Sequence, residues 1–237
     1  MKNLKSLFGF VLVLGLASGC SSDDDTSKLT LALRTNTQPT VVAKAASVNN
    51  LVIDKFLVNI TEIEFDIDNE LQPELPDSVD SDEIVGPFVI DLASTQAEKG
   101  LLLGATVIPA AAYEDIEFEF DVCRDSKYPE LVGHSVYVSG SVNGKHFVIT
   151  TNENWEVEID FEDHSNFVFS GDPQKLFIDF NLYQVLNTLA QIDFAAASDK
   201  NQNGVIEINP SNADGNANLC DVIIEAFENA FDLDDND

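Results

Sequence analysis

Residues 199–210, DKNQNGVIEINP, carry oxygen donors at alternating positions. Positions one, three, five, seven and nine are Asp199, Asn201, Asn203, Val205 through its backbone carbonyl, and Glu207. Gly204 stands at position six, where a sharp turn favours a residue without a side chain. Oxygen ligands at this spacing are typical of loops that bind calcium. The stretch therefore predicts a calcium site.

Position twelve of this stretch departs from the EF-hand pattern, because it is Pro210 and not a bidentate carboxylate. Four residues that follow the loop could supply the missing ligand: Asn212, Asp214, Asn216 and Asp221. We take Asp214 as this ligand. Only Asp199 and Glu207 are charged within the loop, so we expect a weak structural site with a Kd of about 10⁻⁴ to 10⁻³ M. An Asn-rich turn that binds no metal is the alternative interpretation.

Other acidic residues could in principle catalyse hydrolysis. Glu117 and Glu119 lie about 7 Å apart on one face of a strand, a separation found between paired glycosidase carboxylates. The chain has 42 acidic residues, however, so a solvated strand face is the favoured interpretation of this pair and of Glu156, Glu158 and Asp160. The histidines lack zinc-ligand spacing, and no nucleophile or nucleotide-binding motif is present. We therefore expect a protein that is not an enzyme and has no catalytic residues.

Aromatic residues test the main alternative, a carbohydrate-binding module or hydrolase. Trp155 shares strand parity with Val157 and Ile159 and is expected in the core. Tyr113 and Tyr137 also fall in strand patterns, which leaves Tyr128 and Tyr183 as candidates for contact with a sugar.

The elements that position these residues follow mainly from alternation of apolar and polar residues. KLTLALR, GPFVIDL, YEDIEFEF, NWEVEIDF and QKLFIDF each predict a strand. A long strand around residues 56–67 changes phase near Thr61 and Glu62, which indicates a bulge, and Asn143-Gly144 predicts a hairpin. Apolar spacing of three and four predicts helices over 182–189 and 217–231. The fold class is mainly β, an antiparallel β-sandwich of transthyretin-like or Ig-like type with a short helical C-terminal extension.

The first twenty residues combine Lys2 and Lys5, an apolar run of ten residues and small residues before Cys20. This layout resembles a bacterial lipoprotein signal, which implies cleavage before Cys20 and acylation of that residue. Ser21 stands where an Asp would resemble an inner-membrane retention signal, which favours the outer membrane. The Ser-Asp-Asp-Asp run at 22–25 resembles the surface-export signal of Bacteroidota lipoproteins, and a solvated spacer is the alternative interpretation. We divide the chain into a signal peptide (1–19), a lipidated cysteine and acidic tether (20–28), a β-sandwich domain (29–192), and a C-terminal segment with the calcium loop, a helix and an acidic tail (193–237).

Charge and cysteine content limit the partners and the compartment. The formal net charge of −30 excludes nucleic acid as a partner, because phosphates would be repelled. With Cys20 acylated, Cys123 and Cys220 remain, and an oxidising envelope predicts a disulfide between them. Two separate buried thiols are the alternative.

LTLALR, FLVNITEIEFDI, GPFVIDL and LLLGATVIPAAAYEDIEFEF together resemble an uncharacterised domain-of-unknown-function family of bacterial envelope lipoproteins, over residues 28–190. Two motifs depart from that family: Thr37-Gln38-Pro39 replaces Asp-x-Pro, and Ala111 replaces a turn glycine. The resemblance implies a β-sandwich lipoprotein and supplies no catalytic residue. We thus expect an outer-membrane or surface lipoprotein, held by its lipid anchor, with a non-catalytic binding or structural role and an unidentified protein or glycan partner. The residues leave open whether it faces inward or outward on the outer membrane.

Overall fold

The computed structural model describes residues 26–35, 46–48, 51–68, 81–161, 169, 173–191, 197–211, 213–228 and 230–233. Its strands are β1 (Thr26–Thr35), β2 (Ala46–Val48), β3 (Leu51–Ile67), β4 (Ser81–Asp91), β5 (Leu101–Pro109), β6 (Tyr113–Phe120), β7 (Val136–Val142), β8 (Lys145–Thr151), β9 (Trp155–Asp160), β10 (Gln174–Phe180), β11 (Val205–Ile208) and β12 (Phe231–Leu233). The helices are α1 (Leu182–Gln191) and α2 (Cys220–Glu228), with 3₁₀ turns η1 (Ala97–Lys99) and η3 (Ala217–Leu219).

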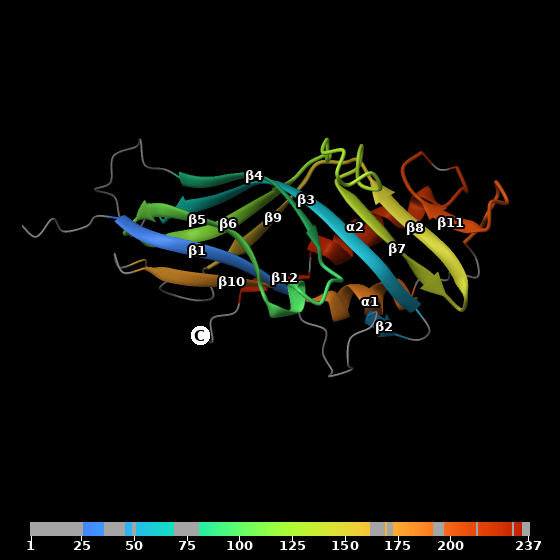
Figure 1. Ribbon diagram of the computed structural model, residues 1–237, viewed down its shortest axis with the longest axis horizontal. Coiled ribbons are helices and arrows are strands. Elements are labelled where there is room, and N and C mark those ends of the chain that lie inside the picture. Colours follow the sequence, from blue (N-terminus) through green and yellow to red (C-terminus); the bar gives the residue numbers. More distant parts are fainter. Residues whose placement is uncertain are drawn as a thin grey trace, which may run out of the picture.

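Within these ranges the fold is mainly β and has two sheets. The smaller sheet has the order β12-β10-β1-β5. The larger has the order β11-β8-β7-β3-β6-β9, with β2 and β4 also paired to β3. In Figure 1 the long strand β3 crosses the molecule, with β1, β5 and β10 over one half and the two helices at the other.

The core lies where apolar faces of both sheets and both helices meet. Leu29, Leu31 and Leu33 of β1 are fully buried, as the leucine alternation predicts. Phe56 of β3 packs against Phe180 and Phe227, with ring centroids 5.5 and 4.7 Å away, so the smaller sheet and α2 meet on the same strand. All these residues belong to one hydrophobic cluster. Removal of its apolar surface from water is the main favourable term in folding.

Local sequence signals place several elements correctly. The pairing of β3 with β4 and β6 shifts register between Ile60 and Glu62, which confirms the predicted bulge. Asn143 and Gly144 have φ values of 50° and 79°, as a tight hairpin between β7 and β8 requires. Asn181 caps the N-terminus of α1, because its Oδ1 accepts a hydrogen bond from the amide of Gln184 at 3.0 Å. The predicted core position of Trp155 is also confirmed, since it is 7% exposed.

Four expectations are corrected. The sheets are mixed and not purely antiparallel, because β1 pairs with β10, and β11 with β8, in parallel. The last three residues of the expected tether (20–28) belong to β1. Residues 231–233, expected at the end of a helix and in the acidic tail, form β12. Val222, one of the apolar residues whose spacing predicts the second helix, is 45% exposed on α2 and does not join its buried face.

The predicted disulfide is also wrong. Cys123 and Cys220 are free and buried. Cys123 packs with Leu57 and Leu131 in a small separate cluster, whereas Cys220 begins α2 and belongs to the main core, so the two thiols occupy different packing environments. Burial raises the pKa of Cys220 to about 11, with smaller contributions from Asp221 and Glu153, which keeps this thiol protonated.

Candidate metal-binding sites

The predicted calcium loop is a tight turn whose side-chain oxygens bond to its own backbone. Asp199 accepts the amides of Asn203 at 3.1 Å and Gly204 at 3.0 Å. Asn201 Oδ1 accepts the amide of Asn203 at 2.9 Å, and Asn203 Oδ1 accepts that of Val205 at 2.8 Å. Gly204 has a φ of 86°, which explains the glycine at position six. The donor residues named from spacing are thus gathered at one loop.

Asp214, the residue chosen from sequence as the twelfth ligand, lies against this loop. Asp214 is 0% exposed, and its two carboxylate oxygens accept hydrogen bonds from the backbone amides of Asn201 at 3.3 Å and Glu207 at 2.9 Å. The carboxylate therefore joins the two ends of the loop. The side chain of Glu207 is bonded as well, because its Oε2 accepts from Asn201 Nδ2 at 2.6 Å.

Asn216 holds the base of the loop. Its Nδ2 donates to the carbonyls of Ser198 and Glu207, both at 2.9 Å, and its Oδ1 accepts the amide of Ser198 at 3.0 Å. Of the other proposed donors, Asp221 is exposed on α2, and Asn212 lies outside the described residues. Asn216 is thus a structural brace of the loop.

The exit from the loop explains the break at position twelve. Residues Val205–Ile208, at loop positions seven to ten, form β11, which runs parallel to β8, and turns follow it where an EF-hand would have its second helix. Pro210 follows the strand at an exposed position. A loop that leaves as a strand must receive its closing carboxylate from a later turn, where Asp214 stands.

A second acidic region lies on the outer face of the larger sheet. We call this set the acidic face: Glu62, Glu64, Asp66, Glu83, Asp115, Glu117, Glu119, Glu156, Glu158 and Asp160. Register places carboxylates opposite one another: Glu62 faces Glu119, Glu64 faces Glu83 and Glu117, and Glu117 faces Glu158. Like charges directly opposite across strands are destabilising, so this face favours protons or cations.

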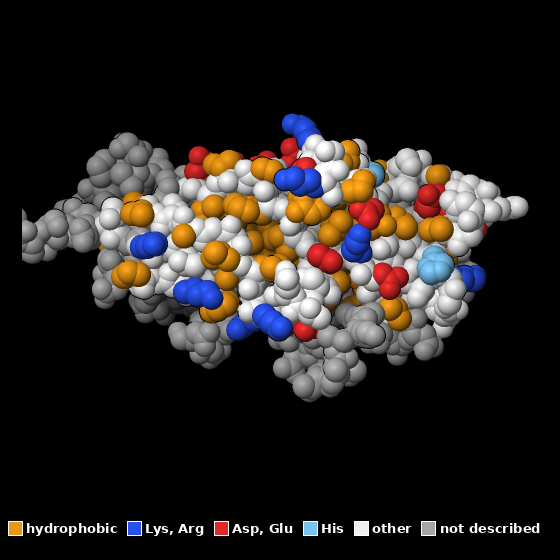
Figure 2. Space-filling model, viewed as in Figure 1, with side chains coloured by type: hydrophobic (Ala, Val, Ile, Leu, Met, Phe, Trp, Pro, Cys, Tyr) orange, Lys and Arg blue, Asp and Glu red, His pale blue; other side chains and the backbone are white. Residues whose placement is uncertain are grey.

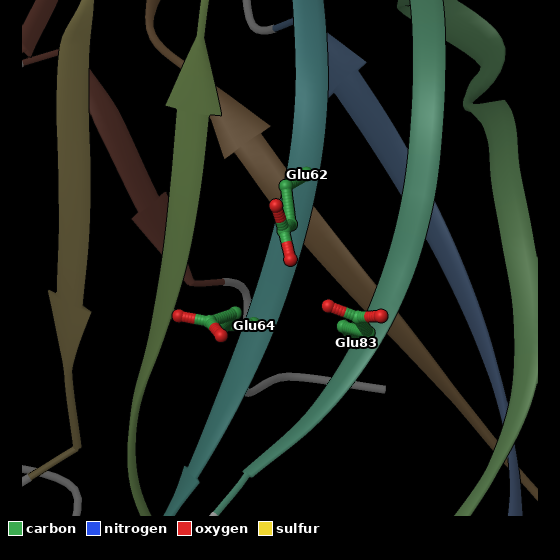
Figure 3. A group of neighbouring side chains, drawn as sticks. All are labelled: Glu62, Glu64 and Glu83. Atoms are coloured by element: carbon green, nitrogen blue, oxygen red, sulfur yellow. The ribbon is translucent and has the colours of Figure 1, made fainter.

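Three of these side chains converge. Glu62, Glu64 and Glu83 each place a carboxylate oxygen within 4.8 Å of the others, the only such group of three found among the described residues (Figure 3). A hydrogen bond with Glu83 and then burial raise the pKa of Glu62 to about 7. Burial, followed by the charge of Asp66, raises the pKa of Glu64. The group can share a proton at neutral pH or coordinate a hard cation through oxygen.

Other residues of the acidic face respond in the same way. Burial and the charges of Asp66 and Glu158 raise the pKa of Asp115 to about 7. Burial and the charge of Glu156 raise the pKa of Glu117. A shallow cavity of about 150 Å³ is lined by Glu62, Glu64, Glu117, Glu119 and Glu156. Sequence reasoning interpreted Glu117 and Glu119 as a solvated strand face and did not include the carboxylates of β3 and β4. The Glu-x-Glu repeats on β3, β6 and β9 could have indicated a shared acidic face.

A larger cavity of about 590 Å³ lies beside the predicted calcium loop. It is lined among others by Glu207, His134, Tyr137 and Asn152. The Nδ1 atom of His134 is buried and has no hydrogen-bond partner among the described residues, and burial lowers the pKa of this histidine. This arrangement can accept a neutral polar molecule.

The tyrosines differ in part from expectation. Tyr113 is 3% exposed in the core, as predicted. Tyr137 is half-buried and packs on the small cluster that also holds Tyr128, so it lies outside the main core. Tyr183, the other predicted candidate, is half-buried on α1 and does not line the large cavity.

The predicted lipidation site, Cys20, lies outside the described residues. Among the described helices, none has the length and apolar character needed to cross a membrane.

Comparison with known proteins gives no relative: no family model, no curated protein and no solved structure matches the chain. The resemblance to the envelope lipoprotein family stays a prediction.

Proposed function

We propose that this chain is a lipid-anchored protein of the bacterial outer membrane that binds calcium at the loop of residues 199–214 and has no catalytic role. The ligands are Asp199, Asn201, Asn203, Val205, Glu207 and Asp214. The observation that carries the proposal is the buried carboxylate of Asp214, which lies against a loop already rich in oxygen donors. Calcium there would tie the turn before α2 to β11, at the edge of the larger sheet.

The envelope location rests on the sequence of residues 1–20. Signal cleavage before Cys20 and its acylation would anchor the chain, and the acidic run after it supports exposure at the cell surface. Membership of the envelope lipoprotein family and a β-sandwich of transthyretin-like or Ig-like type are parts of the same proposal. The two sheets with a shared core support a sandwich.

Calorimetric titration of the full chain with calcium tests the metal site. We expect a Kd of about 10⁻⁴ to 10⁻³ M. At ten times Kd, binding stabilises the fold by about 1.4 kcal/mol and raises Tm by roughly 3–5 °C. Asp199→Ala should remove the effect, whereas Glu98→Gln, which removes one negative charge from an exposed 3₁₀ turn, should retain it.

The acidic face offers a rival site for the same ion, so a second variant is needed. Glu62→Gln/Glu64→Gln/Glu83→Gln disables the convergent carboxylates. Calcium binding that survives Asp199→Ala and disappears in this triple variant would place the ion on the acidic face and contradict the proposed loop site. Absence of calcium binding to any form would contradict the metal proposal altogether.

Carbohydrate binding is the second candidate, favoured by the large cavity with Tyr137 and the unpartnered His134 nitrogen. Tyrosine offers a sugar both a ring face and a hydroxyl. Saturation-transfer NMR with neutral hexoses should give signals that Tyr137→Ala removes and Tyr183→Ala leaves intact. No signal from any hexose would count against this candidate.

A further inference from the structure

The outer face of the smaller sheet is basic and apolar in a strongly acidic protein. Register puts Lys28 opposite Val107, Ala32 opposite Leu102 and Phe177, and Arg34 opposite Asp179. These positions alternate with the buried leucines of β1 and therefore point away from the core. We call this surface the basic face, defined by Lys28, Arg34, Leu102, Val107, Lys175 and Phe177.

The side chains of the basic face combine charge with exposed hydrophobic area. Leu102 is 67% and Val107 59% exposed. Arg34 lies with its guanidinium carbon 5.0 Å from the ring centroid of Phe177, and Lys175 Nζ lies 4.1 Å from the same centroid. Arg34 also pairs with Asp179 at 2.8 Å. Figure 2 shows Lys and Arg side chains among hydrophobic ones over β1 and β10.

Charge is therefore divided between the two sheets. The mature chain would have ten basic residues, the 12 of the full sequence less Lys2 and Lys5. Lys28, Arg34 and Lys175 lie on the basic face, and the exposed Lys99 precedes Gly100, which packs close to the ring of Phe177. The ten carboxylates of the acidic face belong to the other sheet. The basic face is complementary to an anionic surface, whereas the acidic face is not.

The proposed anchor attaches at this same sheet. Cys20 precedes the start of β1 at Thr26 by six residues, which span at most about 21 Å when fully extended. Lys28 is two residues further along β1. An acylated Cys20 thus keeps the basic face within a short reach of the lipid headgroups.

From these observations we propose that the basic face lies on the surface of an anionic lipid bilayer, beside the Cys20 anchor, with the acidic face on the sheet turned away. Lys28 and Lys175 contact lipid phosphates, Arg34 neutralises Asp179 on the same face, and Leu102 and Val107 enter the boundary between headgroups and acyl chains. This inference rests on the proposed lipid anchor and adds the orientation of the protein on the membrane.

The test uses the acylated full chain, purified and reconstituted in vesicles of phosphatidylcholine with 30% phosphatidylglycerol. A bimane fluorophore is attached to Leu102→Cys or, on the acidic face, to Glu156→Cys. Cys123 and Cys220 are 1% and 8% exposed and should not react. Lipids that carry a doxyl quencher should quench the label at position 102 at least threefold more than the label at position 156.

Charge variants decide whether the basic face causes the orientation. Lys28→Glu/Lys175→Glu should reduce quenching at position 102 to the level seen in pure phosphatidylcholine. Lys127→Glu/Lys145→Glu makes the same charge change at exposed positions elsewhere and should leave it unchanged. Equal quenching at positions 102 and 156, or equal effects of both charge pairs, would overturn the proposal.

Two further outcomes are separable. The label at position 102 could instead be shielded from solvent in neutral detergent, to a degree that rises with protein concentration. That result would assign the basic face to a second copy of the chain and overturn membrane docking. If mass spectrometry finds Cys20 unacylated, the envelope proposal fails. The face is then tested independently with the chain tethered through a hexahistidine tag at residue 20 to nickel-chelating lipid, where the same quenching ratio supports or overturns it.

Discussion

Asp214 is the residue on which the geometry of the loop depends most. Its carboxylate accepts two backbone amides that lie at opposite ends of the loop. Replacement by alanine leaves both amides without this partner in a partly buried place. We expect Asp214→Ala to reduce the free energy of unfolding by about 1–3 kcal/mol even without calcium, measured by urea denaturation in chelator.

Asp221→Ala is the matched control for Asp214→Ala, because Asp221 is an exposed aspartate seven residues further on. We expect a change within about 0.5 kcal/mol for this surface substitution. Equal stability of wild type and Asp214→Ala would show that the carboxylate does not brace the loop.

Glu62 gives the protein a dependence on pH. Its pKa is about 7 in the fold, above its ordinary value of 4.5, because of Glu83, burial, Glu64 and Glu119. A raised folded-state pKa means that the folded protein holds the proton more tightly than the unfolded chain. The stabilisation of the fold by this proton on Glu62 is complete below about pH 4.5 and is lost as pH rises through about 7.

Glu62→Gln should therefore raise Tm at pH 8 and have little effect at pH 4. Relief of a cross-strand like-charge contact of up to about 1 kcal/mol corresponds to roughly 1–3 °C. Calorimetric scans at the two pH values measure this difference, and Glu98→Gln serves as a control at an exposed 3₁₀ turn. A Tm gain of the same size at both pH values would contradict the assigned cause.

The residues of the loop could be identified from the sequence, but the convergent carboxylates Glu62, Glu64 and Glu83 could not. Asp199, Asn201 and Asn203 follow a local spacing, and Asp214 follows within fifteen residues, so local chain geometry suffices to bring them together. Glu83 meets Glu62 only because β4 pairs with β3 in a particular register. Register between separate strands is a tertiary property that residue spacing cannot supply.

Among the elements, those that depend on neighbouring residues were predicted best. Alternating leucines, the Asn143-Gly144 turn and the phase change at Thr61 each act over a few residues, and all three appear as expected. The parallel pairings of β1 with β10 and of β11 with β8 were missed. An alternating strand has the same pattern whichever direction its neighbour runs.

Gly140 of β7 shows how closely two elements approach. A Cβ atom at this position would lie 2.0 Å from the carbonyl oxygen of Val52 on β3 and 2.9 Å from the ring of Phe147. Because backbone atoms of a central strand cannot move aside easily, we expect Gly140→Ala to lower the free energy of unfolding by about 1–3 kcal/mol or more. Urea denaturation measures the change.

Ser141→Ala, at the next position of β7, controls for Gly140→Ala, because Ser141 is half-buried and already has a side chain. It should cost clearly less than the glycine substitution. Two equal losses would indicate that general weakening of β7, and not the close approach to β3, is responsible.

At the scale of the whole molecule, the two sheets carry opposite surface character. The net charge of −30 excludes nucleic acid as a partner, but a total cannot show where the charges lie on the surface. Pairing of strands gathers carboxylates on the larger sheet and leaves Lys28, Arg34 and Lys175 on the smaller one. The local surface, and not the total charge, sets the expected behaviour near a membrane.

The smaller sheet also predicts how truncation affects the fold. β1 lies between β5 and β10, and without β10 it becomes an edge strand whose core is open. A chain ending at residue 173 also lacks α1, β11, α2 and β12. We expect it to give no near-ultraviolet circular dichroism and no cooperative thermal transition, unlike the full chain. A sharp transition in the truncated chain would contradict this dependence.

The parallel pairing of β1 with β10 has a consequence for biogenesis. Arg34 of β1 meets Asp179 of β10, a separation of 145 residues, so the parallel partner of β1 is synthesised long after β1 itself. Pairing over such distances slows folding. A nascent chain therefore cannot complete its smaller sheet until β10 has been synthesised, and this late strand commits the protein to its final shape.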